Sequence, residues 1–338
     1  MLFVLAKERK VMKKIKKFFK EYWVLIVFFI FNLVFFYLPI PYTVSGIGGL
    51  IPIEDRFSID DKNISNYYMA YVTSLKGTPA TVLYGLLNKN YEVEKMSLKE
   101  IDDDNLYSQV LLDTSSNSSV INAYKKAGKE ISIDNAYFEV LGFENNSNNL
   151  KVMDKIIGIE GKKFKTEEEV YSAFDSILSE KEVGDKVNLT VERDNKKIDA
   201  WATIVLIDDE KKLGLSGFVS SDISVSPAIK FNFDKHESGP SGGFMMSLAI
   251  YDLLVEDDIA HGLKIAGTGT IDADGNVGVI GGVSHKIRGA KKEDIDIFFV
   301  PDENYEDANK ICKSEGCDFD LVKINTFDEA LEYLKNYN

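Results

Sequence analysis

Two residues in this sequence, Ser241 and Lys286, could together carry out nucleophilic chemistry. Ser241 follows a Gly-Pro corner in Gly239-Pro-Ser-Gly-Gly243, and an apolar stretch that predicts a helix comes next. A serine hydroxyl is a weak nucleophile unless a base lies beside it, and free N–H groups at a helix start can hold an oxyanion. Gly242 and Gly243 would leave room for a substrate. The alternative is that Ser241 only caps the helix, a common role for serine.

Lys286 is the candidate base. A lysine can take a proton from serine only when burial or a nearby cation lowers its pKa. The residues around it, Val279–Val283 and Ile287, are apolar or small, which favours burial. The alternative is a solvated helix lysine, the usual fate of this residue type.

Other polar groups make weaker candidate sites. His236 precedes Ser241 on an extended segment, so its ring is not expected to reach the serine as a base. Asp272-Ala-Asp-Gly-Asn276 lacks the length and the closing Glu of a calcium loop and predicts a hairpin turn. The histidines and the two cysteines have no metal-ligand spacing, so no metal or cofactor is expected. Cys312 and Cys317 could form a disulfide or remain thiols.

The elements that would position Ser241 and Lys286 lie in residues 207–338, where strand and helix patterns alternate. The expected strands are 224–233, 263–271, 277–280, 295–300 and 319–324, and the expected helices are 242–254, 286–292, 304–314 and 327–334. This order predicts an α+β or α/β domain.

Here a family resemblance emerges. Gly239-Pro-Ser-Gly-Gly243, Thr268-Gly-Thr-Ile271, Gly278-Val-Ile-Gly-Gly282 with Lys286, and Phe298-Phe-Val-Pro-Asp-Glu-Asn304 resemble, in order and spacing, the Lon protease proteolytic domain. The resemblance implies that Ser241 is the nucleophile, that Lys286 is the general base and that the Thr268 hydroxyl orients the lysine. Gly242 stands where the family has alanine. Ser238 stands where many members have an acidic residue.

Residues 136–206 make a separate module. We expect strands at 137–141, 150–161, 187–191 and 198–206, a loop at 145–149 and a helix at 166–178. This order, with Lys155-Ile-Ile-Gly-Ile-Glu-Gly161, resembles a PDZ domain, although Met153 stands where a glycine precedes the aspartate. PDZ domains add an extended peptide to a sheet edge, which implies Tyr137–Leu141 as the receiving strand. The alternative is a spacer that binds nothing.

The N-terminal region predicts a membrane anchor. Tyr22–Leu38 has one polar side chain, Asn32, and as a helix would rise about 25 Å. Residues 1–21 carry eight Lys or Arg and two Glu, a net +6 against −20 for the rest of the chain. Basic residues before the span place the N-terminus in the cytoplasm and everything after Pro39 outside. The alternative is a cleaved signal peptide. The acidic remainder argues against nucleic acid as a partner.

The region between the span and the PDZ-like module is mixed. Residues 42–62 contain several turn formers, Tyr67–Val72 predicts a strand, and Thr78-Pro79 predicts the start of a helix to Lys89. Residues 97–128 have helical spacing that a Ser/Asn cluster at 114–119 is expected to interrupt. Tyr67–Val72 and the helix after it resemble the start of the Lon fold, which would make the PDZ-like module an insertion.

The expected fold is therefore α+β: a Lon-type proteolytic domain with a PDZ-like module and one N-terminal transmembrane helix. The expected borders are a cytoplasmic tail (1–21), a signal anchor (22–38), an extracytoplasmic juxtamembrane region (39–135), the PDZ-like domain (136–206) and the proteolytic domain (207–338). This architecture resembles the membrane-anchored PDZ–Lon proteases of Gram-positive bacteria.

The resemblance implies a single-pass serine endopeptidase of the cell membrane that cleaves exported peptides or membrane-associated proteins outside the cytoplasm. No G-x-x-x-x-G-K-[ST] sequence occurs in these 338 residues, so we expect cleavage without ATP. The expected partners are a peptide or protein substrate and the lipid bilayer, and the sequence leaves open whether the chain forms a homo-oligomer. The alternative function is a tethered peptide-binding scaffold with an inert Lon-like domain.

Overall fold

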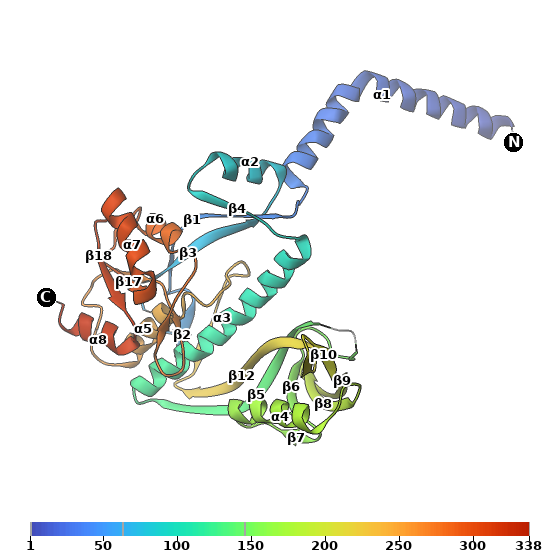
Figure 1. Ribbon diagram of the computed structural model, residues 1–338. Helices are drawn as coiled ribbons and strands as arrows, with labels where there is room; N and C mark the ends of the chain where they lie inside the picture. Colours follow the sequence, from blue (N-terminus) through green and yellow to red (C-terminus); the bar gives the residue numbers. More distant parts are fainter. Residues whose placement is uncertain (1, 63, 145–146, 338) are drawn as a thin grey trace. The chain divides into compact units, whose positions relative to one another are not determined.

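The structure is a computed structural model that describes residues 2–62, 64–144 and 147–337 (Figure 1). Asn145 and Asn146 of the expected loop at 145–149 lie outside the described residues. The chain divides into two compact units. One comprises Met1–Ile47 and Val72–Asp102, and the other comprises Gly48–Tyr71 and Asp103–Asn338.

The smaller unit begins with one long helix, α1 (Leu2–Tyr37), which continues through the basic tail into the apolar segment. Within it, Lys16–Tyr37 is long and apolar enough to cross a membrane, with a mean hydropathy of 1.8. The remaining elements of this unit are parts of β1 (Tyr42–Pro52), β3 (Tyr67–Lys76) and α3 (Leu98–Lys126), together with α2 (Pro79–Leu87) and β4 (Tyr91–Lys95). β1 and β4 pair antiparallel. The side chain of Thr78 accepts from the Thr81 amide and caps α2, as predicted.

The expectation of turns across residues 42–62 is wrong for its first half, because β1 continues as a strand through three glycines. A Cβ on Gly46 would lie 2.3 Å from the Tyr91 ring, and one on Gly48 would lie 2.0 Å from the Tyr71 carbonyl oxygen. These glycines allow close contact with neighbouring chain rather than a change of direction.

The larger unit contains a mainly parallel sheet in the order β18 (Asp320–Ile324), β17 (Ile297–Pro301), β14 (Ile265–Gly267), β3, β1. Its helices are α5 (Gly243–Leu254), α6 (Val283–Ala290), α7 (Asp302–Glu315) and α8 (Phe327–Lys335). α5 is apolar around most of its circumference because it is buried in the main core, together with residues of α3, β17 and α8. The alternation of strand and helix predicted for this region is confirmed.

The segment expected as one strand at 263–271 is two short strands, because the chain leaves the sheet after Gly267. β15 (Thr270–Ile271) and β16 (Val277–Gly278) form a hairpin around Asp272–Asn276. The Asp272 side chain accepts from the amides of Asp274 and Asn276, and Gly275 has φ 89°. The predicted hairpin turn is therefore confirmed.

α3 runs without a break through the Ser/Asn cluster at 114–119, so the expected interruption is wrong (Figure 1). Ser116 Oγ donates to the Leu112 carbonyl and Ser119 Oγ donates to the Ser115 carbonyl. These local bonds satisfy the buried hydroxyls inside the helix, although serine alone favours turns and caps.

A second sheet has the order β12 (Leu215–Ser226), β5 (Glu130–Phe143), β6 (Lys155–Ile159), β8 (Lys186–Arg193), β9 (Lys196–Thr203), with β7 (Lys162–Lys163) beside β6. Its helix is α4 (Glu167–Glu180), which Thr166 caps as predicted. The remaining strands are a hairpin of β10 (Val205–Ile207) and β11 (Glu210–Lys212), and a pair of β2 (Phe57–Ile59) and β13 (Ile229–Phe231). In sequence, the second sheet lies between α3 and β13.

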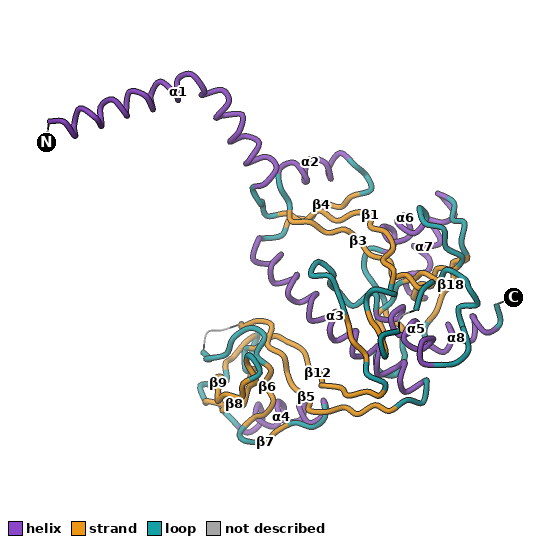
Figure 2. The backbone as a smooth tube through the Cα atoms, turned by 180° about the vertical axis from the view of Figure 1, so that it is seen from behind, coloured by secondary structure: helices purple, strands orange, loops and turns teal. Residues whose placement is uncertain are grey.

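Tyr137–Leu141 is not a free receiving strand, contrary to the sequence-based expectation. It belongs to β5, which pairs along its whole length with β12 and also pairs with β6 (Figure 2). The sheet extends to Ser226, and its outer strands are β12 and β9. The sequence did not indicate this order because β12 lies far from β5 in the chain.

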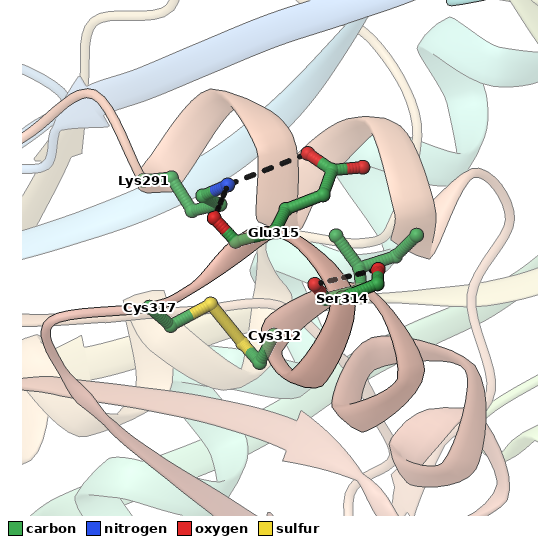
Figure 3. Close-up of a disulfide and its surroundings, with 6 residues drawn as sticks. Lys291, Cys312, Ser314, Glu315 and Cys317 are labelled. Atoms are coloured by element: carbon green, nitrogen blue, oxygen red, sulfur yellow. Dashed lines mark hydrogen bonds and ion pairs between the residues drawn. A yellow bond between two sulfur atoms is a disulfide. The ribbon is translucent and has the colours of Figure 1, made fainter.

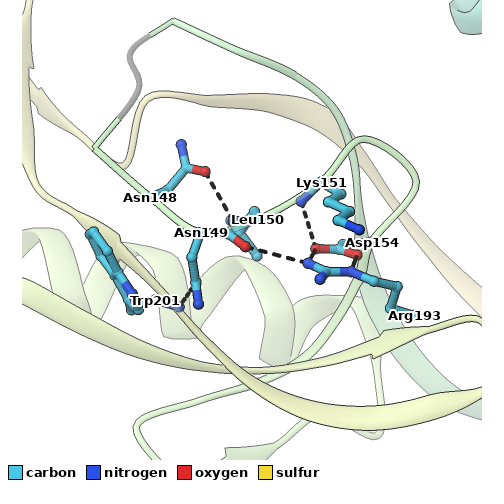
Figure 4. A network of polar contacts seen from close by, with 7 residues as sticks. All are labelled: Asn148, Asn149, Leu150, Lys151, Asp154, Arg193 and Trp201. Atoms are coloured by element: carbon cyan, nitrogen blue, oxygen red, sulfur yellow. Dashed lines mark hydrogen bonds and ion pairs between the residues drawn. The ribbon is translucent and has the colours of Figure 1, made fainter.

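An ion pair between buried Asp154 and partly exposed Arg193 fixes the turn before β6 (Figure 4). Asp154 accepts from Nε and a terminal nitrogen of Arg193, each at 2.6 Å, and from the Lys151 amide at 2.8 Å. Met153, which replaces the glycine of the PDZ pattern, has φ 71°. The left-handed conformation explains why glycine suits this position, and methionine adopts it here at a cost in backbone strain.

Candidate active site

Ser241 lies on a tight turn at the start of α5. Gly239 has φ 89°, and the Gly243 amide donates to the Pro240 carbonyl at 3.1 Å. The Ser241 carbonyl accepts from the Gly269 amide at 2.8 Å, and the Phe244 amide donates to the Gly269 carbonyl at 3.1 Å. The turn is therefore joined to the segment that follows β14, and Ser241 remains partly exposed.

The structure brings together the three side chains that the sequence singled out. Nζ of Lys286 lies 2.7 Å from Oγ of Ser241 and 2.9 Å from Oγ1 of Thr268. The Thr268 hydroxyl donates to the Ser241 carbonyl at 3.1 Å, so its oxygen can accept from the lysine amine. Thr268 therefore links the backbone of Ser241 to the side chain of Lys286.

Lys286 is held by the start of α6, which begins three residues earlier than predicted. Gly282 has φ 66° and turns the chain into the helix. Just before it, the Asn304 side chain accepts from the Ile280 amide at 2.9 Å and donates to the Ile280 carbonyl at 3.0 Å. Asn304 thus fixes the segment that aims Lys286 at Ser241.

The environment of Lys286 favours a neutral amine. The residue is only 2% exposed, and burial lowers its pKa from 10.5 to about 7. Arg288 and Lys291 lie nearer the surface, where both pair with Glu315. Figure 3 shows the contact of Lys291 with Glu315. Lys286 is thus a buried lysine of this helix whose amine lies within hydrogen-bond distance of a hydroxyl.

The space beside Gly242 is filled by Met69 and is not left open for a substrate. A Cβ at this position would lie 2.6 Å from the Met69 sulfur, so Met69 occupies the volume that the family's alanine methyl would fill. Among the described residues, the amides of Ser241 and Gly242 have no hydrogen-bond acceptor. They are candidate oxyanion donors, whereas the amides of Gly243 and Phe244 are already bonded.

α3 supports the turn that carries Ser241 through residues that sequence reasoning missed. Ser115 Oγ donates to the Pro240 carbonyl at 3.0 Å, and Ser119 Oγ donates to the Gly243 carbonyl at 2.7 Å. The Ser108 carbonyl accepts from the Gly239 amide at 2.7 Å. Serines spaced four residues apart on a continuous helix were the available signal, but the cluster was interpreted as a loop.

The remaining polar groups near the turn do not reach the nucleophile. His236 is exposed, and the Ser241 hydroxyl contacts Lys286 instead. Glu237 pairs with Arg56 at 2.6 Å, which ties the segment before Ser241 to the loop that follows β1. Ser238, which stands where many members of the Lon family have an acidic residue, is exposed.

Cys312 and Cys317 form a disulfide with their Cα atoms 5.0 Å apart, at the end of α7 (Figure 3). The sequence left this pairing open. The bridge closes the helix end and lies on a different element from Ser241 and Lys286.

Comparison with known proteins shows what the C-terminal part of the chain is similar to. Residues 234–336 match the model of the Lon protease (S16) C-terminal proteolytic domain. The Lon protease of Campylobacter jejuni subsp. jejuni is 31% identical over 142 residues, covering 40% of this chain and 18% of that protein. The Lon protease of Campylobacter concisus is 33% identical over 97 residues, covering 28% and 12%. The chain thus contains a Lon-type proteolytic domain but spans less than a fifth of the length of these relatives.

Solved PDZ domains are among the structural neighbours of this chain. The PDZ domain of an SdrC-like protein from Listeria innocua is 28% identical and covers 24% of this chain and 92% of that chain, with a TM-score of 0.21. The corresponding domain from Listeria monocytogenes is 25% identical and covers 26% and 92%, also with a TM-score of 0.21.

Proposed function

We propose that this chain is a membrane-anchored serine endopeptidase that uses Ser241 and Lys286 and needs no ATP. The observation that carries the proposal is the 2.7 Å contact between Ser241 Oγ and a lysine amine that is 2% exposed. An amine with a pKa near 7 is a competent base at neutral pH. The lack of a phosphate-binding loop in these 338 residues supports the ATP-independent part.

In the proposed mechanism, neutral Lys286 takes the proton of Ser241 while Oγ bonds to the scissile carbonyl carbon. Thr268 donates to the Ser241 carbonyl and accepts one amine hydrogen, which leaves the lysine lone pair directed at the serine. The amides of Ser241 and Gly242 stabilise the oxyanion. Protonated Lys286 then gives its proton to the departing amine as the C–N bond breaks.

The second half of the reaction restores the enzyme. Water attacks the acyl ester as Lys286 again accepts a proton, and the ester bond to Oγ breaks. Lys286 then returns the proton to Ser241 as the carboxylic acid leaves. Each proton therefore passes through one amine, as a two-residue mechanism requires.

The test is cleavage of an unstructured protein by the purified full chain in detergent. We expect Ser241→Ala and Lys286→Ala each to lower kcat/KM by about a thousandfold or more, because the two residues act as a unit. Lys292→Ala is the matched control, since Lys292 is exposed, and should cleave like wild type. Near-normal cleavage by Lys286→Ala would overturn the mechanism.

The second candidate function is a peptide-binding scaffold with an inert proteolytic domain. The PDZ-like sheet supports the peptide-binding part of this function. Its outer strand β12 is in contact with α4. We propose that an extended substrate segment adds to β12, in place of the strand first expected. Binding without cleavage by wild type would support the scaffold alone.

The membrane anchor is part of the same proposal. Lys16–Tyr37 has the length and composition of a span, and none of it is buried within the chain. Lysines precede it, which predicts a cytoplasmic N-terminus and a catalytic domain on the outer side. Retention of the full-length chain in carbonate-washed membranes would support an anchor, whereas release of a shortened chain would indicate a signal peptide.

A further inference from the structure

The short helix α2 carries an apolar face that the described residues of its own unit leave exposed. Leu83, Leu86 and Leu87 occupy positions i, i+3 and i+4, so they share one side of the helix. Leu86 is 71% exposed and Leu87 is 80% exposed, with Tyr84 beside them at 55%. A clustered exposed face of this kind marks an interaction surface.

The opposite side of α2 is packed, so its orientation is fixed. A Cβ on Gly85 would lie 2.6 Å from a methyl group of Val93 and 3.1 Å from one of Val44. The helix therefore rests on β1 and β4 through Gly85. Its leucines consequently point away from β1 and β4.

The position of α2 next to the end of α1 indicates what could cover its exposed leucines. The Ile40 amide donates to the Gly77 carbonyl at 2.8 Å, and the Gly77 amide donates to the Tyr42 carbonyl at 2.7 Å. Gly77 directly precedes the cap of α2, so α2 begins beside the residues that follow the apolar segment. α1 and α2 also pack against each other.

We infer that α2 lies in the outer interface of the bilayer, with Leu83, Leu86 and Leu87 inserted among the lipids. This rests on the proposed membrane anchor, because a span that ends at Tyr37 brings the adjoining helix to the membrane surface. α2 has no charged side chain, Tyr84 suits the headgroup level, and exposed Lys89 follows the helix where anionic lipid would attract it. The helix would hold the unit against the membrane.

The test is depth-dependent fluorescence quenching of the full chain in vesicles of phosphatidylcholine and phosphatidylglycerol. Because Cys312 and Cys317 are bonded to each other, a single introduced cysteine can carry an environment-sensitive dye. The labelled variants are Leu87→Cys for α2, Phe29→Cys for the span and Glu94→Cys as the control. Glu94 is exposed and neighbours Val93, which faces α2, so its side chain points to the other side of β4.

We expect lipid nitroxides near the headgroups to quench the dye at position 87, and nitroxides deep in the acyl chains to quench the dye at position 29. Aqueous iodide should quench only the dye at position 94. Quenching at 29 together with iodide quenching at 87 would overturn the docking of α2 while leaving the anchor intact. A dye at 87 shielded from both lipid and iodide would also overturn it, in favour of a second protein copy. Iodide quenching at 29 would refute the anchor itself.

Discussion

At the scale of single residues, the proposed chemistry depends on a lysine that is kept without charge. Lys286 has a side-chain amine in a buried site with two hydroxyl neighbours and no carboxylate partner among its hydrogen bonds. Burial therefore dominates, and it lowers the pKa to about 7. A buried amine without its charge avoids most of the desolvation cost of a buried cation.

Replacing this lysine should change how stability depends on pH. The folded chain releases the Lys286 proton near pH 7, whereas the unfolded chain holds it to about pH 10.5, so stability rises with pH between these values. Between these pH values, we expect the free energy of unfolding of wild type to rise by on the order of 4 kcal/mol relative to that of Lys286→Met. Urea unfolding at several pH values measures the difference. Lys292→Met, at an exposed site, should follow wild type, and a Lys286→Met curve parallel to wild type would contradict the lowered pKa.

The sequence singled out three side chains that the structure brings within hydrogen-bond distance of one another. Ser241, Thr268 and Lys286 stand in or near short segments whose glycines and proline favour turns, and such segments can be recognised without knowledge of the fold. The role of Gly242 was misjudged, because the packing of Met69 against it comes from a strand distant in sequence. Local patterns carry no information about such contacts.

At the scale of elements, α3 supports the turn that carries Ser241. Its Ser115 and Ser119 hydroxyls donate to the carbonyls of Pro240 and Gly243, on either side of Ser241. The sequence placed a break here because serine and asparagine favour turns when considered alone. Tertiary partners reverse that preference, since each buried hydroxyl in the helix finds a carbonyl acceptor.

Ser115→Ala should therefore lower activity more than Ser116→Ala. The first change removes the hydroxyl that ties α3 to the Pro240 carbonyl, which then keeps only the local bond from the Gly243 amide, whereas Ser116 bonds only within α3. We expect Ser115→Ala to raise the activation free energy by about 1 kcal/mol, because Ser241 is held less firmly. This change lowers kcat/KM about fivefold to tenfold, with substrate affinity less affected. Equal kinetics for the two variants would show that α3 does not position Ser241.

The disulfide should stabilise its element without affecting catalysis. Cys312 and Cys317 close a short loop at the end of α7. The closed loop lowers the entropy of the unfolded chain, which raises the free energy of unfolding by about 2 kcal/mol. The double variant Cys312→Ser, Cys317→Ser should melt at lower temperature and keep its kcat/KM at a temperature where it is folded. Thermal unfolding followed by circular dichroism measures the first effect, and an unchanged melting temperature would contradict it.

At the scale of the whole molecule, the chain combines a proteolytic domain with a separate sheet inserted between α3 and β13. The alternating elements of residues 207–338 and the order of the PDZ-like elements were predictable from periodicity and turn residues. The pairing of β5 with β12 was not, because strands so far apart in sequence are joined only by tertiary hydrogen bonds. As a result, the sequence assigned the peptide-receiving edge to a strand that is already paired on both sides.

If β12 receives substrate, a peptide that occupies its edge should slow the cleavage of proteins. The same peptide should leave the cleavage of a short fluorogenic substrate unchanged, because that substrate needs only the Ser241 site. Inhibition constants for both substrates, measured with wild type, separate the two effects. Equal inhibition of both would place the peptide at the nucleophile instead.

The central claim is that a neutral Lys286 activates Ser241, and the most direct test is the rate at which a fluorophosphonate modifies the full chain as a function of pH. We predict that the modification, located on Ser241 by mass spectrometry, rises to half its maximal rate near pH 7 and is lost in Lys286→Met. A rate independent of pH, or one that Lys286→Met retains, would contradict the account.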